Sequence, residues 1–294
     1  MRLPELFEVQ VDGGDLAVAR WGTGPKVVLA LHGITASHLN WLHVAQQFAE
    51  DEVTILAPDF RGRGASGTLP GPFGYDQHVK DLLAVMEHQG LDRVTIVGHS
   101  MGAFIAIKFA MTQAARVESL VLVDGGVPLA IPAGLDPDVV LAAILGPAME
   151  RLSKSFESLE ACRDFWRVHP ALAGDWSPEI EAYVDYDIRE VDGAWVSRVN
   201  ADAIRADGRD PLVDEALQHC LPTLGVKMRF FGAPRGLMNG DPLYPAGLVE
   251  SLSSAIEDFE AQWAHDVNHY TITMSAQGSA QVAPVIRAAL AEVD

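Results

Sequence analysis

Apolar segments separated by helical stretches constrain this chain more than any other feature of its sequence. The apolar segments of the first half run without polar alternation and lie at residues 26–31, 53–57, 94–97 and 120–123. Continuous runs of this kind are typical of strands buried on both faces of a sheet. Helical stretches lie between them, near residues 38–50, 75–90 and 100–115. The alternation predicts an α/β fold, a mostly parallel sheet with helices on both faces.

The ends of the chain complete this sheet. Residues 6–21 are predicted to form a hairpin, because alternating residues flank the turn Asp12-Gly13-Gly14. The last strands are expected at 228–231 and 259–263, followed by a closing helix at 277–291.

One long segment breaks the alternation. Residues 129–215 lack buried-strand runs and are rich in Phe, Trp and Tyr. We expect a helical insertion, or lid, in which some aromatic side chains line the pocket beneath it. The predicted domains are therefore a core of residues 1–128 and 216–294 and a helical lid of residues 129–215.

Charge and composition exclude several classes of partner. The net charge of −19 argues against binding to nucleic acid or to an anionic membrane surface, because like charges repel. No run approaches the roughly 18 apolar residues of a membrane-spanning helix, and the N-terminus lacks the apolar stretch of a signal peptide. Cys162 and Cys220 are too few for a zinc site, and the sequence leaves open whether they pair. We expect a soluble, cytoplasmic protein of undetermined oligomeric state.

The sharpest chemical signal is the segment Gly98–Gly102, with the sequence G-H-S-M-G. A predicted strand precedes it and a helical stretch follows it, which is the context that a nucleophile elbow requires. The flanking glycines permit close backbone approach, since a Cβ atom at either place would collide with neighbouring elements. Ser100 is therefore the predicted nucleophile, with the N-terminus of a helix directed at the developing oxyanion.

A second signal is the segment Leu31–Ser37, directly after the first buried strand. A tetrahedral intermediate needs two backbone N–H donors for its oxyanion. We expect one donor from Met101, next to the nucleophile, and the other from Ile34 in this loop. His32 is expected to brace the loop rather than to transfer protons.

These motifs resemble those of the α/β-hydrolase superfamily, in the same order and over essentially the whole chain. The resemblance is carried by His32-Gly33, the segment Asp59–Ser66 (D-F-R-G-R-G-A-S), the elbow and a late histidine. It implies an eight-stranded sheet with a lid inserted after the sixth strand, the place that residues 129–215 occupy.

The late histidine supplies the expected general base. A serine hydroxyl is a weak nucleophile until a base takes its proton. His269, in the sequence V-N-H-Y-T, has the position that the superfamily resemblance implies, and His265 is its only rival.

The acid of the triad has two candidates. Family members usually carry it after the seventh strand, where this chain has Arg235, although Asp241 follows shortly in the sequence D-P-L-Y-P. Asp124, at the end of the strand beside the nucleophile strand, is the alternative, and polyketide-synthase thioesterases use that place. We favour Asp124, because Arg235 and the glycine-rich insertion after it displace Asp241 from the strand end.

No cofactor or metal is expected. Gly62–Gly67 matches G-x-G-x-x-G, but Thr68–Pro72 cannot open the helix that a dinucleotide site needs. No H-E-x-x-H motif, EF-hand or carboxylate cluster suggests a metal ion.

The sequence thus predicts a serine hydrolase that cleaves an ester or thioester of a small or medium acyl substrate through Ser100, His269 and an aspartate. Serine at the nucleophile position disfavours the haloalkane dehalogenase and epoxide hydrolase branches, which use aspartate. A carbon–carbon bond hydrolase, an acyltransferase, and a non-catalytic small-ligand-binding protein of the same fold remain alternatives.

Overall fold

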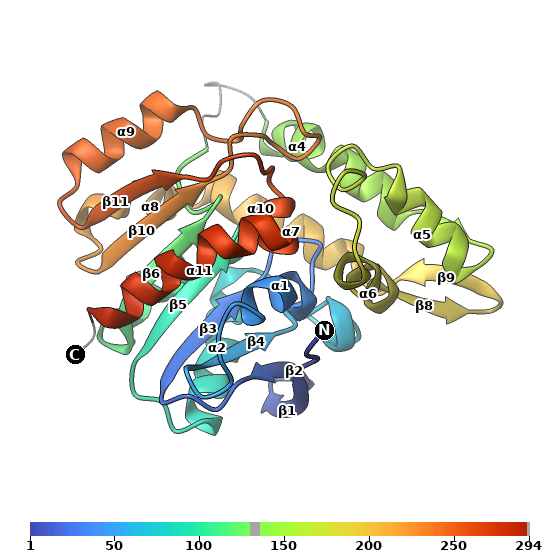
Figure 1. The fold of residues 1–294 in the computed structure, drawn as a ribbon, viewed down its shortest axis with the longest axis horizontal. Coiled ribbons are helices and arrows are strands. Elements are labelled where there is room, and N and C mark those ends of the chain that lie inside the picture. Colours follow the sequence, from blue (N-terminus) through green and yellow to red (C-terminus); the bar gives the residue numbers. More distant parts are fainter. Residues whose placement is uncertain (130–135, 293–294) are drawn as a thin grey trace.

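The computed structural model describes residues 1–129 and 136–292, and an eight-stranded sheet runs through its centre (Figure 1). The spatial order is β1-β2-β4-β3-β5-β6-β10-β11. Strand β2 is antiparallel to both of its neighbours, and the other neighbouring strands are parallel. The strands are β1 Glu5–Val11, β2 Gly14–Trp21, β3 Lys26–Leu31, β4 Val53–Pro58, β5 Val94–His99, β6 Val117–Val123, β10 Lys227–Gly232 and β11 Phe259–Trp263. The predicted mostly parallel sheet is confirmed.

Helices cover both faces of this sheet, and each face has its own apolar core. Residues of β3 alternate between them, with Leu29 and Leu31 in one core and Val28 and Ala30 in the other. Helices α2, α3 and α9 contribute to the first core, and α1, α10 and α11 contribute to the second. These helices are α1 Leu42–Ala45, α2 Tyr75–His88, α3 Met101–Gln113, α9 Ala246–Ala255, α10 Thr271–Met274 and α11 Ala276–Ala291. The helix expected near 38–50 is shorter than predicted, because a 3-10 turn, His38–Trp41, precedes the four residues of α1.

A long insertion separates β6 from β10, and its elements α5, α6, β8 and β9 lie at the right of Figure 1, away from the large sheet. Its elements are α4 Pro137–Leu152, β7 Ser155–Phe156, α5 Leu159–Arg167, α6 Pro178–Asp187, β8 Ile188–Val191, β9 Ala194–Ser197, α7 Ala201–Val213 and α8 Glu215–His219. Three short strands pair as a separate antiparallel sheet in the order β7-β9-β8. The insertion, which was expected to be helical, therefore also contains a small sheet that the sequence analysis did not predict. Residues 130–135 of the expected lid lie outside the described residues.

Helices of the insertion begin at polar caps that the sequence supplies. Ser158 caps α5, Ser177 caps α6 and Asn200 caps α7, each by accepting a hydrogen bond from an N–H in the first turn. Such caps satisfy donors that have no partner within the helix. Cys162 of α5 and Cys220 after α8 are both buried and form no disulfide. Within residues 1–129 and 136–292, no helix has the length and apolar character needed to cross a membrane.

Candidate active site

Ser100 sits on a strained turn between β5 and α3. Its backbone angles, φ 56° and ψ −119°, lie in a region that residues other than glycine rarely adopt. A Cβ atom on Gly98 would lie 2.4 Å from the backbone nitrogen of Ala103, and one on Gly102 would lie 2.2 Å from the carbonyl oxygen of Leu31. Both glycines are therefore required for the turn to pack against its neighbours, as a nucleophile elbow demands.

The end of the adjacent strand β6 meets this turn. The N–H of Ser100 donates to the carbonyl of Val123, over 3.0 Å. Asp124 follows with a φ of 44°, and a Cβ atom on Gly125 would lie only 2.3 Å from the carbonyl oxygen of Ser100. The chain after β6 therefore passes directly against the elbow. The serine itself is half-buried.

Asp124 binds the ring of His269. Its Oδ2 lies 2.7 Å from Nδ1 of His269, and its Oδ1 accepts the N–H of Ala233 over 3.0 Å. The Asp124 and His269 residues are 1 % and 3 % exposed, so water does not compete for this hydrogen bond. An ionised carboxylate only accepts, and Nδ1 therefore carries the proton. Within the described part of the chain, Nε2 of His269 has no partner, so its lone pair can accept a proton.

The rival residues lie elsewhere. Asp241 is exposed, and its backbone oxygen packs under Gly236 in the loop after β10. His265 is exposed too, with 75 % of its side chain accessible. Of the two aspartates, only Asp124 is hydrogen-bonded to the His269 ring. Arg235, which has the usual position of the acid, donates from Nε to the carbonyl of Val267 over 3.3 Å.

Two residues that sequence reasoning did not assign hold the His269 loop in place. Nε2 of His99 lies 2.8 Å from the carbonyl oxygen of His269 and donates to it. Burial, the nearby His269 and His32 place the pKa of His99 well below its usual value, although its bond to the carbonyl opposes this. Asn268 accepts the N–H groups of Tyr270 and Thr271 on its Oδ1. The position of Asn268 next to the predicted base is the only signal that the sequence offers for its role.

The expected oxyanion donors flank Ser100. Met101 is the first residue of α3, where N–H groups lack a partner within the helix. On the other side, a Cβ atom on Gly33 would lie 3.4 Å from Cβ of Ser100, so the loop carrying Ile34 lies over the serine. Among the described residues, the N–H of Ile34 donates to no protein acceptor. Both groups are therefore available to a negatively charged oxygen.

His32 fixes the peptide that carries the Ile34 N–H. Its Nε2 accepts the N–H of Phe60 over 3.0 Å, which places the ring proton on Nδ1. Nδ1 then donates over 2.7 Å to the carbonyl of Gly33, the oxygen of the same peptide. Complete burial, with the nearby Arg63 charge, lowers the pKa of His32 to about 3 despite the opposing charge of Asp59. The ring is neutral at pH 7 and acts as a brace.

The depressed pKa of His32 makes the stability of the protein pH-dependent. Between about pH 6.5, the unfolded value, and about pH 3, the unfolded chain binds a proton at this residue that the folded chain does not. The free energy of unfolding therefore falls with decreasing pH, by about 1.4 kcal/mol per unit from this residue. Urea titrations between pH 7 and 4.5 should show that His32→Gln loses this part of the slope. The exposed-site variant His265→Gln should retain it, and equal slopes in wild type and His32→Gln would contradict the assignment.

These groups form a site for nucleophilic acyl chemistry. A serine lies at a helix N-terminus, a histidine has a ring nitrogen without a partner among the described residues, and the loop that carries Ile34 passes close to the serine. In the part of the chain that the structure describes, no cluster of His, Cys, Asp and Glu side chains has the number and proximity to hold a metal ion.

Sequence comparisons match less than half of the chain. A family model for the alpha/beta hydrolase fold matches residues 26–159. Lipase LipV from Mycobacterium tuberculosis is 38% identical over 116 residues, which are 39% of this chain and 43% of the lipase. Epoxide hydrolase 2 from Siraitia grosvenorii is 35% identical over 115 residues, 38% of this chain and 36% of that protein. The chain thus matches less than half the length of these relatives.

Solved structures match nearly the whole chain. The thioesterase domain from the curacin biosynthetic pathway has a TM-score of 0.78 at 17% identity and covers 97% of this chain and 100% of its own. E-2-(acetamidomethylene)succinate hydrolase has a TM-score of 0.76 at 18% identity, with 98% and 100% covered. At these identities the structures show the fold alone.

Proposed function

Because this chain has the α/β-hydrolase fold, we propose that it is a serine hydrolase that cleaves an ester or thioester of a small or medium acyl substrate. The proposal assigns Ser100 as nucleophile, His269 as base and Asp124 as acid, with the N–H groups of Ile34 and Met101 as the oxyanion hole. The relatives that match it in sequence include a lipase and an epoxide hydrolase, which support hydrolysis as the type of reaction.

In the proposed reaction, Oγ of Ser100 forms a bond to the acyl carbon while Nε2 of His269 takes the hydroxyl proton. The carbonyl electrons move onto the oxygen, which the two N–H groups stabilise. When the tetrahedral intermediate collapses, the bond to the alkoxide or thiolate breaks and His269 returns the proton to that leaving group. A water molecule then releases the acid from the acyl-enzyme by the same steps.

A single observation carries this proposal, the 2.7 Å hydrogen bond between Asp124 and Nδ1 of His269. It keeps the proton on Nδ1, stabilises the imidazolium that forms during catalysis and leaves Nε2 ready to accept. Serine at the centre of the elbow also favours an acyl-enzyme over the aspartyl chemistry of epoxide hydrolases. Polyketide thioesterases also carry the acid at this position, at the end of the sixth strand. This similarity favours thioesters as substrates alongside esters.

Covalent labelling tests the proposal. A fluorophosphonate probe should modify wild-type protein at Ser100 and lose its target in Ser100→Ala. Turnover is then measured on p-nitrophenyl esters of increasing chain length and on acyl-CoA thioesters. Absence of labelling would favour a non-catalytic ligand-binding protein. Labelling without ester or thioester cleavage would favour an acyltransferase or a carbon–carbon bond hydrolase.

A further inference from the structure

The loop after β4, residues 59–67, is the surface on which the lid docks. Gly62 has a φ of 83°, and a Cβ atom there would lie 2.6 Å from Cβ of Ala203 on α7. The carbonyl of Gly62 accepts the N–H of Asn200, the cap of α7, over 2.8 Å. The close approach of α7 therefore explains why residue 62 is a glycine, although the segment Gly62–Gly67 resembles a nucleotide-binding loop.

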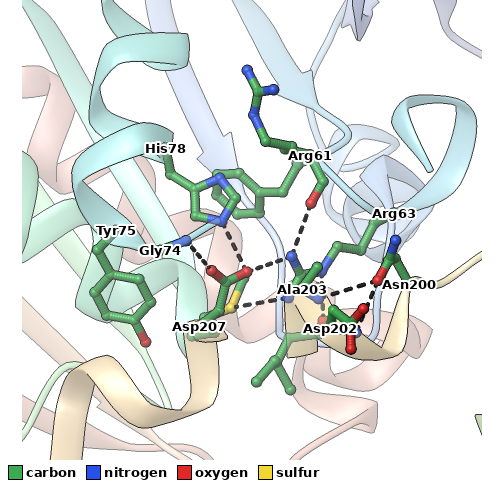
Figure 2. Close-up of polar contacts among 12 residues, drawn as sticks. Arg61, Arg63, Gly74, Tyr75, His78, Asn200, Asp202, Ala203 and Asp207 are labelled. Carbon is green, nitrogen blue, oxygen red and sulfur yellow. Dashed lines mark hydrogen bonds and ion pairs between the residues drawn. The ribbon is translucent and has the colours of Figure 1, made fainter. Parts of the chain in front are cut away.

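Arg63 of this loop bonds to Asp207 of α7 (Figure 2) and also to Ile34, one of the two expected oxyanion donors. Its guanidinium is fully buried. Nε donates to the carbonyl of Ile34 over 2.9 Å, and Nη2 lies 3.8 Å from the sulfur of Met101. Nη1 donates to the carbonyl of Arg61 over 2.9 Å and to the carboxylate of Asp207. One side chain thus touches both residues that are expected to bind the oxyanion.

Asp207 belongs to lid helix α7 and is itself held on all sides. Its Oδ1 accepts the N–H of Gly74 over 2.7 Å, and its Oδ2 accepts Nε2 of His78 over 2.9 Å as well as Arg63 (Figure 2). Burial by itself would raise the pKa of Asp207, but Arg63 and His78 outweigh it and hold the pKa at about 2. The carboxylate is therefore charged at neutral pH and fixes one end of the guanidinium.

We propose that Arg63 is a positioning residue that couples the placement of helix α7, through Asp207, to the geometry of the Ile34 amide, and that it contacts Met101 through the side-chain sulfur. The proposal rests on the proposed hydrolase function, in which the Ile34 and Met101 amides bind the oxyanion.

The geometry gives this coupling a reason. An oxyanion donor works only when its N–H points at the reacting oxygen from about 2.7–3.1 Å. His32 fixes the Gly33 carbonyl before the Ile34 N–H, and Arg63 fixes the Ile34 carbonyl after it. If Asp207 moves away with α7, the guanidinium loses its charged partner and no longer holds that carbonyl in one place. A displacement of the donor by a fraction of an ångström weakens the binding of the transition state more than it weakens the binding of the substrate.

A second contact between lid and core provides the control. Oη of Tyr186 on α6 donates to Oδ2 of Asp59 over 2.6 Å. Neither side chain of this pair bonds to Ile34 or Met101 in the described structure. Tyr186→Phe therefore loosens the lid without touching the Arg63 connection, whereas Asp207→Asn breaks the connection and retains the shape of the side chain.

The first experiment records backbone amide NMR spectra of the full chain, labelled with ¹⁵N. Asp207→Asn should shift or broaden the resonances of Ile34 and Met101, whereas Tyr186→Phe should leave both unchanged. Because a buried guanidinium without its partner can prevent folding, the double variant Arg63→Met/Asp207→Asn removes both charges together. It should show the same changes at Ile34 and Met101.

The second experiment measures kinetics and the binding of a trifluoromethyl ketone, which forms an oxyanion when Ser100 adds to it. Asp207→Asn and the double variant should lower kcat by about 10- to 100-fold and weaken ketone binding by a similar factor, with KM nearly unchanged. Tyr186→Phe and the exposed-site variant Asp202→Asn, also on α7, should retain wild-type kcat. This split between kcat and KM would not arise from a merely structural ion pair.

The outcomes separate the two proposals. Unchanged Ile34 and Met101 resonances in Asp207→Asn and in the double variant would overturn the coupling, as would altered resonances with an unchanged kcat. A drop in kcat that Tyr186→Phe reproduces would also overturn it, because lid loosening alone would then be the cause. Wild-type protein that neither hydrolyses esters nor binds the ketone would overturn the proposed function, while the amide resonances would still decide whether α7 is coupled to Ile34.

Discussion

Replacing Ser100 with alanine is expected to lower turnover of the best ester or thioester substrate by about 10⁶-fold. The side chain supplies the atom that bonds to the acyl carbon, and no neighbouring group can replace it. The fold should survive, because alanine keeps the Cβ atom in the strained turn and the backbone bond from Ser100 to Val123 is unaffected. Steady-state kinetics on purified protein, with active sites counted by the fluorophosphonate probe, measure the loss.

Two controls make this result decisive. Thermal unfolding of Ser100→Ala should match that of wild type, and Ser254→Ala, at an exposed serine of α9, should retain full turnover. If Ser100→Ala hydrolyses the same substrates at the wild-type rate, Ser100 is not the nucleophile and the mechanism is wrong.

Asp124→Asn is expected to lower turnover by about 10⁴-fold. The amide retains the size of the carboxylate but can present an N–H to Nδ1 of His269. The ring then places its proton on Nε2, where it blocks the transfer from Ser100, and the imidazolium loses its counter-charge. Michaelis–Menten kinetics with the same substrate panel measure the effect, which should fall on kcat.

Asp241→Asn is the matched substitution in the competing loop. Its side chain is exposed and makes no hydrogen bond to His269 in the described structure, so turnover should stay at the wild-type level. A large loss in Asp241→Asn together with normal turnover in Asp124→Asn would return the acid to the loop after β10.

The sheet could be predicted from the sequence because each buried parallel strand has a continuous run of apolar residues. A strand such as β5 or β6 has its side chains covered on both faces, so nearly every position is apolar. The small sheet of the insertion has no such apolar run in its strands. Its strands have two to four residues with mostly exposed or half-buried side chains, so their pairing depends on tertiary contacts rather than on a hydrophobic pattern.

The elbow and His269 were also open to prediction, because each lies in a recognisable local sequence. The choice of acid was less constrained, since it depends on which loop reaches the far nitrogen of His269 in space. The displacement of Asp241 by Arg235 and the following glycine-rich segment favours Asp124. The structure places Asp124 at the His269 ring, and its catalytic role stays a prediction until the variants are measured.

The connection from Arg63 to Ile34 lay beyond sequence reasoning for a different reason. Asp207 is 144 residues away along the chain, and no local pattern links an arginine in a glycine loop to an acid in a distant helix. The depressed pKa of His32 likewise arises from complete burial and from the charges around it. Both effects belong to the assembled protein and not to any segment of it.

The docking of the lid on Gly62 has a consequence for anyone who would exchange lids to change substrate range. A grafted α7 must present a small side chain where Ala203 meets Gly62, since a larger one would displace the helix. It must also carry an acid in the place of Asp207, or leave the Arg63 guanidinium buried without a counter-ion. A chimera that keeps these two positions leaves the contacts of Arg63 with Ile34 unchanged. One that alters them also changes the surroundings of Ile34, so a new substrate range could not be assigned to the exchanged segment alone.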